Sequence, residues 1–589
     1  METISYEYGD ALYVNLTNRC DCACIFCLRN NGHKGSIYAD DLWLEHEPSR
    51  EEALADLLGR EEAMWVVGAD LQKFTDMRRE ADAGDSQAVS AMGRLKKLFG
   101  SVAGEAALVR RWMGGLVLTE ADYAAHPILA DYRFFIGEEA EKGRHMLDTS
   151  AEELLGRMQG CAGGAWTDLR GYLTSFAHAP MNGKEYTLTQ LRGFIHSPDK
   201  ALRKAAFEAE LACSKSIEGG MAFALNGVKE HMNLMAELRG YGDVMTMTMA
   251  QCRMQPETLK ALWGAVEDAL PKFHAYLCRK ARVLGYEKGL PWYELCAGLG
   301  ESGQRFDTEG ARAYLVELLG AFAPDLGEMV DRAFREHWID FYPRPGKSGG
   351  AFCRNLSNQK QSRVLTNFEG NLDGVVTIAH ELGHAYHGHL IQDHRPLNRT
   401  YTMPVAETAS NFNETLVMNA AIARARGQEK LALLEQRLQD YTQVICDIYS
   451  RFLFEREVFE ERKGGFLFPE RLCRIMAETQ KTAYGPGLDP ACLHPYMWVN
   501  KVHYYYTTLS FYNFPYAFGG LFARGLYAKY QQEGKDFVPL YKKMLHATSV
   551  TCVEDTAKIA GIDLTDKAFW RQGLQSLADE IDLFCDLVK

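Results

Sequence analysis

The chain has 589 residues and a net charge of −13 at pH 7, which argues against a general nucleic-acid binder because phosphate neutralisation needs clustered lysine and arginine. Its hydrophobic content of 47% is normal for a globular protein and supports one large enzyme body or several domains. No secretory signal opens the sequence, no apolar run approaches the roughly 20 residues of a membrane helix, and the 15 cysteines are mostly scattered singly. We therefore expect a cytoplasmic protein with neither nucleic-acid nor membrane partners.

The first 60 residues differ from the rest of the chain in their sequence pattern. The segment "ALYVNLT", Ala11 to Thr17, alternates and is β-branched enough to predict a strand. In the following "NRCDCACIFCLRN", Cys20, Cys24 and Cys27 form a C-x3-C-x2-C motif that could hold a 4Fe–4S cluster with S-adenosylmethionine on the free iron. The stretch resembles the first strand and cluster loop of radical SAM enzymes, but these need a β/α barrel of about 200 residues. Simple cluster or metal binding, or free thiols, are the alternatives.

From about Arg50 onward the pattern is helical. "SREEALADLLGREEAMWVV" has a serine cap, then acidic residues, then leucine and alanine at helical spacing. Similar periods continue along the chain and predict a mostly α fold. One β-like segment interrupts them, from Gly349 to Asp373, where a glycine-rich start and the alternating "RVLTNF" predict a hairpin or small sheet.

The next predicted helix carries the strongest chemical signal. In "VVTIAHELGHAYHGHL", Val375 to Leu390, the motif H-E-x-x-H places His380 and His384 one turn apart on the same face. Two imidazoles in that arrangement can share one Zn²⁺ at about 2.0–2.1 Å. Glu381, beside the first histidine, can then take a proton from a water molecule at the metal. The apolar flanks predict burial, and buried imidazoles need a partner.

Hydrogen-bonded core or surface histidines are the alternative interpretation of this motif. His387 also competes as a ligand, since it lies three residues after His384. We expect His389 and His394 on the solvent side of the helix or in the following loop.

A third ligand is needed, because catalytic zinc takes three protein ligands and keeps one open position. The helical stretch "MPVAETASNFNETLVMNAA", Met403 to Ala421, carries Glu407, Asn411 and Glu414 at positions i, i+4 and i+7. Glu407 can complete a His, His, Glu site, and Asn411 and Glu414 can support the ligands from behind. The alternative for Glu407 is a carboxylate favoured by the helix dipole at an N-terminus.

Three segments resemble one enzyme family. "FEGNLDGVVTIAHELGHAYHGHL", "PVAETASNFNETL" and "HYYYTTLSFYNFPYAFGG" are similar to oligoendopeptidase F and its thimet-oligopeptidase-like relatives, and the resemblance runs from about residue 65 to the end. It implies a zinc endopeptidase that hydrolyses oligopeptides in a deep channel of a helical, zincin-like body. It also implies that His380, His384 and Glu407 bind the single zinc ion and that Glu381 is the general base.

The same resemblance implies an oxyanion-stabilising segment near the C-terminus. In the family a histidine and tyrosines perform this role, and the matching residues are His503, Tyr512 and Tyr516. Packing in an aromatic core is the alternative for most rings of this segment.

The resemblances divide the chain into a radical SAM-like fragment at 1–60, a helical oligopeptidase F region at 61–195 and a zinc peptidase domain at 196–589. The leading hypothesis is a zinc oligoendopeptidase. The alternatives are an iron–sulfur radical enzyme that uses the N-terminal cysteines, and an inactive helical protein that binds peptides.

Overall fold

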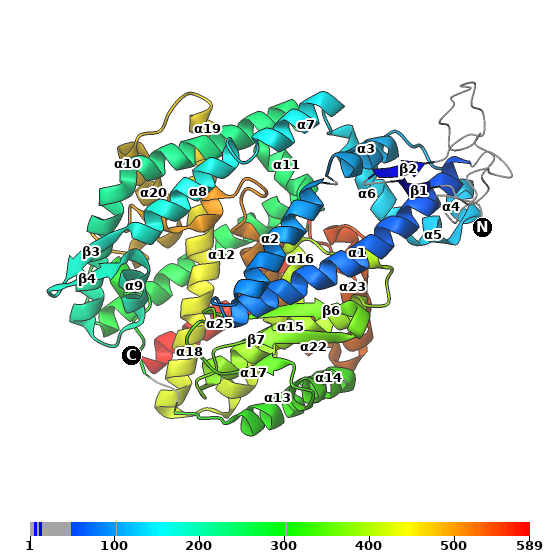
Figure 1. Cartoon of the computed structure of the whole chain (residues 1–589). Coiled ribbons are helices and arrows are strands. Elements are labelled where there is room, and N and C mark those ends of the chain that lie inside the picture. Colours follow the sequence, from blue (N-terminus) through cyan, green and yellow to red (C-terminus); the bar gives the residue numbers. More distant parts are fainter. Residues whose placement is uncertain (1–4, 9–10, 15–48, 102, 301–302) are drawn as a thin grey trace, which may run out of the picture. The chain divides into compact units, whose positions relative to one another are not determined.

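The computed structural model describes residues 5–8, 11–14, 49–101, 103–300 and 303–589. The chain forms two compact units, one of Met1–Met146 with Gln392–Thr400, and one of Leu147–Ile391 with Tyr401–Lys589. Both are built mainly of helices (Figure 1), so the predicted mostly α fold is confirmed. The domain boundaries at residues 60 and 195 stay predictions. A bilayer-spanning helix is not found among the described residues.

The first unit begins with an antiparallel pair, β1 (Ser5–Tyr8) and β2 (Ala11–Val14), so the strand predicted from Ala11 is confirmed as far as Val14. Cys20, Cys24 and Cys27 lie outside the described residues. The α-helices of this unit are α1 (Arg50–Ala81), α2 (Ser86–Ser101), α3 (Ala103–Gly114), α4 (Glu120–Ala125), α5 (Pro127–Asp131) and α6 (Arg133–Arg144). Helix α1 starts at the predicted serine cap, where Ser49 and Glu52 form a capping box.

The second unit holds the large core and most of the helices. Its first half contains α7 (Thr149–Met158), α8 (Gly163–Phe176), β3 (His178–Met181), β4 (Lys184–Thr187), α9 (Leu188–Gly193), α10 (Lys200–Leu238), α11 (Val244–Gln251), α12 (Pro256–Val283), α13 (Thr308–Phe322) and α14 (Pro324–Arg335). Its second half contains β5 (Ile339–Asp340), β6 (Phe352–Leu356), β7 (Gln361–Leu365), α15 (Leu372–Ile391), α16 (Met403–Ala406), α17 (Thr408–Arg424), α18 (Gly427–Thr442), α19 (Ile448–Arg462), α20 (Pro469–Tyr484), α21 (Met497–Asn500), α22 (Phe514–Glu533), α23 (Phe537–Ala547), α24 (Val553–Lys558) and α25 (Lys567–Leu587).

The predicted β element before the histidine helix is confirmed. Strands β6 and β7 form an antiparallel hairpin, and β5 pairs with β7 in parallel, which gives the order β5-β7-β6. Strand β6 therefore lies at an edge of this small sheet. It is tied to α15 by Asn355, whose Nδ2 donates to the carbonyl oxygen of His384 at 3.2 Å.

Two glycines let the helices of the histidine region approach one another closely. A Cβ atom on Gly383 of α15 would lie 2.5 Å from the Cα atom of Ser410 in α17. A Cβ atom on Gly519 of α22 would lie 2.6 Å from the Cβ atom of Glu407. No larger side chain fits at either contact. The glycine inside the H-E-L-G-H motif thus brings α15 against the segment that carries Glu407.

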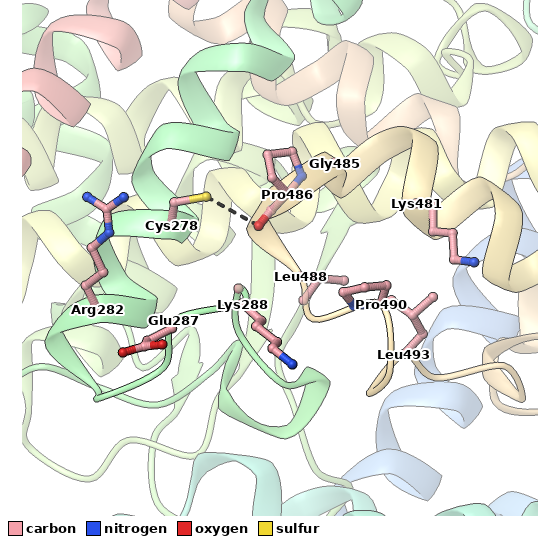
Figure 2. A pocket seen from close by; sticks show the side chains of 11 residues that line it. Cys278, Arg282, Glu287, Lys288, Lys481, Gly485, Pro486, Leu488, Pro490 and Leu493 are labelled. Carbon is pink, nitrogen blue, oxygen red and sulfur yellow. Dashed lines mark hydrogen bonds between the residues drawn. The ribbon is translucent and has the colours of Figure 1, made fainter.

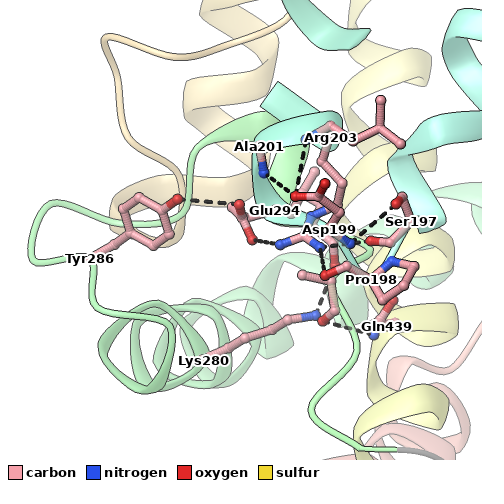
Figure 3. Close-up of polar contacts among 12 residues, drawn as sticks. Ser197, Pro198, Asp199, Ala201, Arg203, Lys280, Tyr286, Glu294 and Gln439 are labelled. Atoms are coloured by element: carbon pink, nitrogen blue, oxygen red, sulfur yellow. Dashed lines mark hydrogen bonds and ion pairs between the residues drawn. The ribbon is translucent and has the colours of Figure 1, made fainter. Parts of the chain in front are cut away.

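Buried ion pairs join other helices of the second unit, and we call them the closed pairs. Lys229 of α10 bonds Glu455 of α19 at 2.5 Å, and Lys280 of α12 bonds Glu435 of α18 at 2.5 Å. Arg203 bonds Glu294 at 2.6 Å, and Figure 3 shows this contact with Lys280 nearby. In each pair the buried cation has a carboxylate partner, which limits the cost of removing both charges from water.

Candidate active site

The ligand atoms predicted from the sequence form a small triangle. Nε2 of His380 lies 3.2 Å from Nε2 of His384 and 3.3 Å from Oε2 of Glu407. The third side, from His384 Nε2 to Glu407 Oε2, measures 3.5 Å. In tetrahedral coordination with bonds of about 2.0–2.1 Å, ligand atoms lie about 3.3–3.4 Å apart. The triangle therefore fits a zinc ion with the fourth position open.

Glu407 reaches the histidines because the predicted helix is interrupted at this residue. The stretch from Met403 forms α16, ends at Glu407 with φ −88° and ψ 4°, and restarts as α17. The side chain of Glu407 is held by Ser410, whose Oγ donates to Oε2 at 2.9 Å. Burial alone would raise the pKa of Glu407, but His380, His384 and the Ser410 bond lower it to about 2. The carboxylate is thus held in its charged form, as a metal ligand requires.

Glu414 orients the first histidine. Its Oε1 lies 2.7 Å from Nδ1 of His380 and accepts the Nδ1 proton, which turns Nε2 toward the triangle. Burial would lower the pKa of His380, but Glu407 and Glu414 raise it well above its usual value, so a metal bound at Nε2 would displace a proton. Burial lowers the pKa of His384 to about 4, which keeps this imidazole neutral and able to bind a metal. Asn411, predicted beside Glu414 as a supporting residue, lines the neighbouring cavity.

Glu381 has a buried carboxyl oxygen without a hydrogen-bond partner among the described residues. This atom is Oε2, and the side chain as a whole is buried as well. Burial is the main reason why the pKa of Glu381 is raised to about 7, with the charge of His380 acting in the opposite direction. A carboxyl group with a pKa near neutrality can both take up and release a proton at pH 7.

The other histidines of α15 do not join the triangle. His387 is buried, with Nε2 2.7 Å from Oγ1 of Thr548 and its ring stacked on Tyr401 at 4.0 Å. His389 is exposed, as expected from the sequence. His387 is therefore a core histidine with a hydroxyl partner.

A cavity of about 740 Å³ opens beside the triangle. His380, Glu407, Glu414, His503 and Tyr516 are among its lining residues, whereas Tyr512 is not. The structure thus brings the predicted C-terminal segment to the same cavity as the histidine helix.

His503 stands within a group of aromatic rings, 4.9 Å from Tyr512 and 5.8 Å from Tyr516 between ring centroids. Oδ1 of Asn513 lies 3.1 Å from Nδ1 of His503 and accepts a hydrogen bond from Arg451 at 3.3 Å. Because arginine only donates, this atom is an oxygen, and Nδ1 of His503 must carry the proton. Burial lowers the pKa of His503, so its Nε2 can donate to an anion only after a proton is added.

The sequence is similar to those of several known peptidases. Residues 322–576 match the model of peptidase family M3. The chain is 25% identical over 388 residues to oligopeptidase PepF of Bacillus subtilis (strain 168), covering 65% of this chain and 57% of PepF. It is 26% identical over 463 residues to group B oligopeptidase PepB of Streptococcus agalactiae serotype III (strain NEM316), covering 76% of each. In sequence, the chain resembles peptidases of the oligoendopeptidase F type.

A solved structure shares the fold of the chain. The chain superimposes on the crystal structure of oligoendopeptidase-F from Enterococcus faecium with a TM-score of 0.69, covering 91% of this chain and 94% of that one. The two are 19% identical, so the match establishes a shared fold. With PepF, by contrast, the alignment spans less than two thirds of the relative's length.

Proposed function

We propose that the chain is a zinc-dependent oligoendopeptidase that hydrolyses internal bonds of short peptides. The observation that carries this proposal is the triangle of His380, His384 and Glu407, with sides of 3.2–3.5 Å, next to the unbonded carboxyl group of Glu381. A zinc ion held by the triangle would supply a Lewis acid that polarises a peptide carbonyl and lowers the pKa of water.

Glu381 is the general base in this proposal. With a pKa of about 7, its carboxylate removes a proton from the attacking water and then passes that proton to the leaving amine. Since Oε2 has no competing partner among the described residues, the base is free to accept the proton.

Tyr516 and His503 stabilise the negative charge that develops on the carbonyl oxygen. Burial raises the pKa of Tyr516, so its hydroxyl stays protonated and can donate. His503 donates through Nε2 in its doubly protonated form, while Asn513 holds Nδ1. Tyr512 is the weaker candidate, because its hydroxyl contacts Sδ of Met403 at 3.7 Å and it does not line the cavity.

The edge strand β6 offers a place for the peptide backbone. It follows the glycine-rich segment from Gly346 and lies against the histidine helix through Asn355. An extended peptide can add to such an edge as a further strand, with main-chain hydrogen bonds that do not depend on its sequence.

Metal analysis and a quenched peptide series of increasing length test the proposal together. We expect about one zinc per chain, cleavage at internal bonds, loss of activity on chelation and recovery with zinc. His389→Ala is the matched control, since this exposed histidine lies on the same helix. Protein that carries iron in place of zinc, or zinc-loaded protein that cleaves none of the peptides, would overturn the proposal.

A further inference from the structure

Some charged groups around the cavity are bonded to a group of opposite charge, and others are not. Arg437 and Arg524 both bond Glu580, at 2.6 and 3.2 Å, so these two cations already have a carboxylate. Asp373 and Glu414 contribute negative charge from α15 and α17, whereas burial and these two carboxylates raise the pKa of Asp440 in α18 to about 7. Near His503 the charged lining residues are cations: Arg451 and Lys501 act on His503, and Arg192 acts on Lys501.

Lys501 is the unmatched member of this cationic group. It is partly buried, and none of the residues that the structure describes accepts a hydrogen bond or forms an ion pair with its ammonium group. Burial and the charge of Arg451 lower the pKa of Lys501 to about 7. The buried lysines elsewhere differ, because Lys229 and Lys280 each bond a glutamate at 2.5 Å.

The carboxylates nearest to Lys501 are already engaged. Asp447 is bonded by Arg451, and the same arginine also donates to Asn513. Glu210 accepts from Asn500 at 2.7 Å and lies 3.1 Å from His494 and 3.6 Å from Arg192. Neither acid is bonded to the lysine. A partly buried ammonium group with no bonded counter-ion is unfavourable, and an anion that binds there recovers part of the cost.

We infer that Lys501, with Arg192 and Arg451, binds a carboxylate of the substrate peptide on the His503 side of the cavity. This inference rests on the proposed function and narrows its substrates to peptides with a negative charge close to the cleaved bond. Lys501 precedes His503 by two residues, so their Cα atoms lie at most about 7 Å apart. The carboxylate therefore belongs within a few residues of the scissile bond.

The carboxylate can come from the C-terminus of a short peptide or from an acidic side chain. Matched quenched peptides separate the two sources, one pair ending in a free acid or an amide, and another carrying glutamate or glutamine beyond the cleaved bond. We expect wild-type kcat/KM to favour one charged member by about 10- to 100-fold, as for a hydrogen bond between charged groups. Lys501→Met should remove most of that preference, and Lys501→Arg should keep it.

Lys481→Met is the matched control. Lys481 is an exposed lysine that lines a separate cavity of about 390 Å³ with Arg282 and Lys288, as Figure 2 shows. Its substitution should leave the acid-to-amide and Glu-to-Gln ratios unchanged. Equal cleavage of charged and neutral peptides by the wild type, or an unchanged preference in Lys501→Met, would overturn the inference while leaving the proposed function standing.

Thermal unfolding gives a second readout that does not depend on hydrolysis. Without peptide, Lys501→Met should raise Tm, since it removes a partly buried charge that bonds no carboxylate among the described residues. A dipeptide with a free C-terminus should raise the Tm of the wild type more than that of Lys501→Met, if the C-terminus is the source. If no peptide were hydrolysed, the proposed function would fail. The Tm shifts of wild type and Lys501→Met, measured with the dipeptide and with a peptide that carries an acidic side chain, would still decide whether a carboxylate binds.

Discussion

The closed pairs and the candidate active site are both sets of charged groups inside the second unit, but they are satisfied differently. Lys229 and Lys280 each have a carboxylate at 2.5 Å, and the side chains of both lysines are fully buried. Oε2 of Glu455 has no hydrogen-bond partner among the described residues, but its Oε1 bonds Lys229. At the active site Glu381 bonds no cation of the described residues, its Oε2 has no partner there, and three ligand atoms lie close together. The paired charges of the closed pairs stabilise the packing of helices. Polar groups without such a partner can bind a metal, a proton or a substrate.

The largest effect should follow from removing a corner of the triangle. We expect His380→Ala, His384→Ala and Glu407→Ala each to lose zinc and to fall to background activity, because two ligands do not hold the metal tightly. Zinc content and peptide hydrolysis measure this, with His387→Ala as the control that keeps most of its zinc. Wild-type zinc affinity in Glu407→Ala would make Glu414 the better third ligand.

Glu381→Gln tests the unbonded carboxyl group. The amide keeps the shape of the side chain but cannot take a proton, so we expect kcat to fall by about 10²–10⁴-fold or more with zinc content unchanged. Single-turnover hydrolysis alongside metal analysis measures both quantities. An active glutamine variant would remove Glu381 from the mechanism, and a metal-free one would make it a ligand.

His503→Ala and Tyr516→Phe should each lower kcat by about 10²–10³-fold, since an oxyanion donor acts mainly in the transition state. KM should change little and zinc content not at all. Tyr512→Phe, measured in parallel, should show the smaller loss because its hydroxyl contacts Met403. If both tyrosine variants kept the wild-type rate, the aromatic segment would be core packing and the contrast with the closed pairs would weaken.

The smallest effect on catalysis should come from a closed pair. Glu455→Leu leaves Lys229 buried without a counter-ion, so we expect unfolding free energy to fall by about 3–5 kcal/mol. The kcat of the folded fraction and its zinc content should stay at wild-type values. Lys229→Met/Glu455→Leu removes both charges and should recover most of the stability in denaturant titrations. A loss of kcat in the folded double variant would show that this pair also supports the active site.

Much of the active site follows from local sequence. His380 and His384 share a face because an α-helix repeats every 3.6 residues, and Glu381 adjoins the first of them because it is the next residue in the sequence. The capped start of α1 at Ser49 and the hairpin before α15 are equally local, set by capping and by alternation of side chains. Patterns of this kind depend on neighbours a few residues apart, so they can be read without the fold.

Tertiary packing decided the rest. The break that aims Glu407 at the histidines sits inside a stretch whose pattern is continuously helical, and the close approach of α22 through Gly519 is not a local property. The bond from Glu414 to His380 spans 34 residues, and Arg192, Arg451 and Lys501 reach one cavity from distant parts of the sequence. Whether a buried charged group has a partner of opposite charge depends on which side chains the fold brings within a few ångströms. Periodicity in one segment carries no information about that.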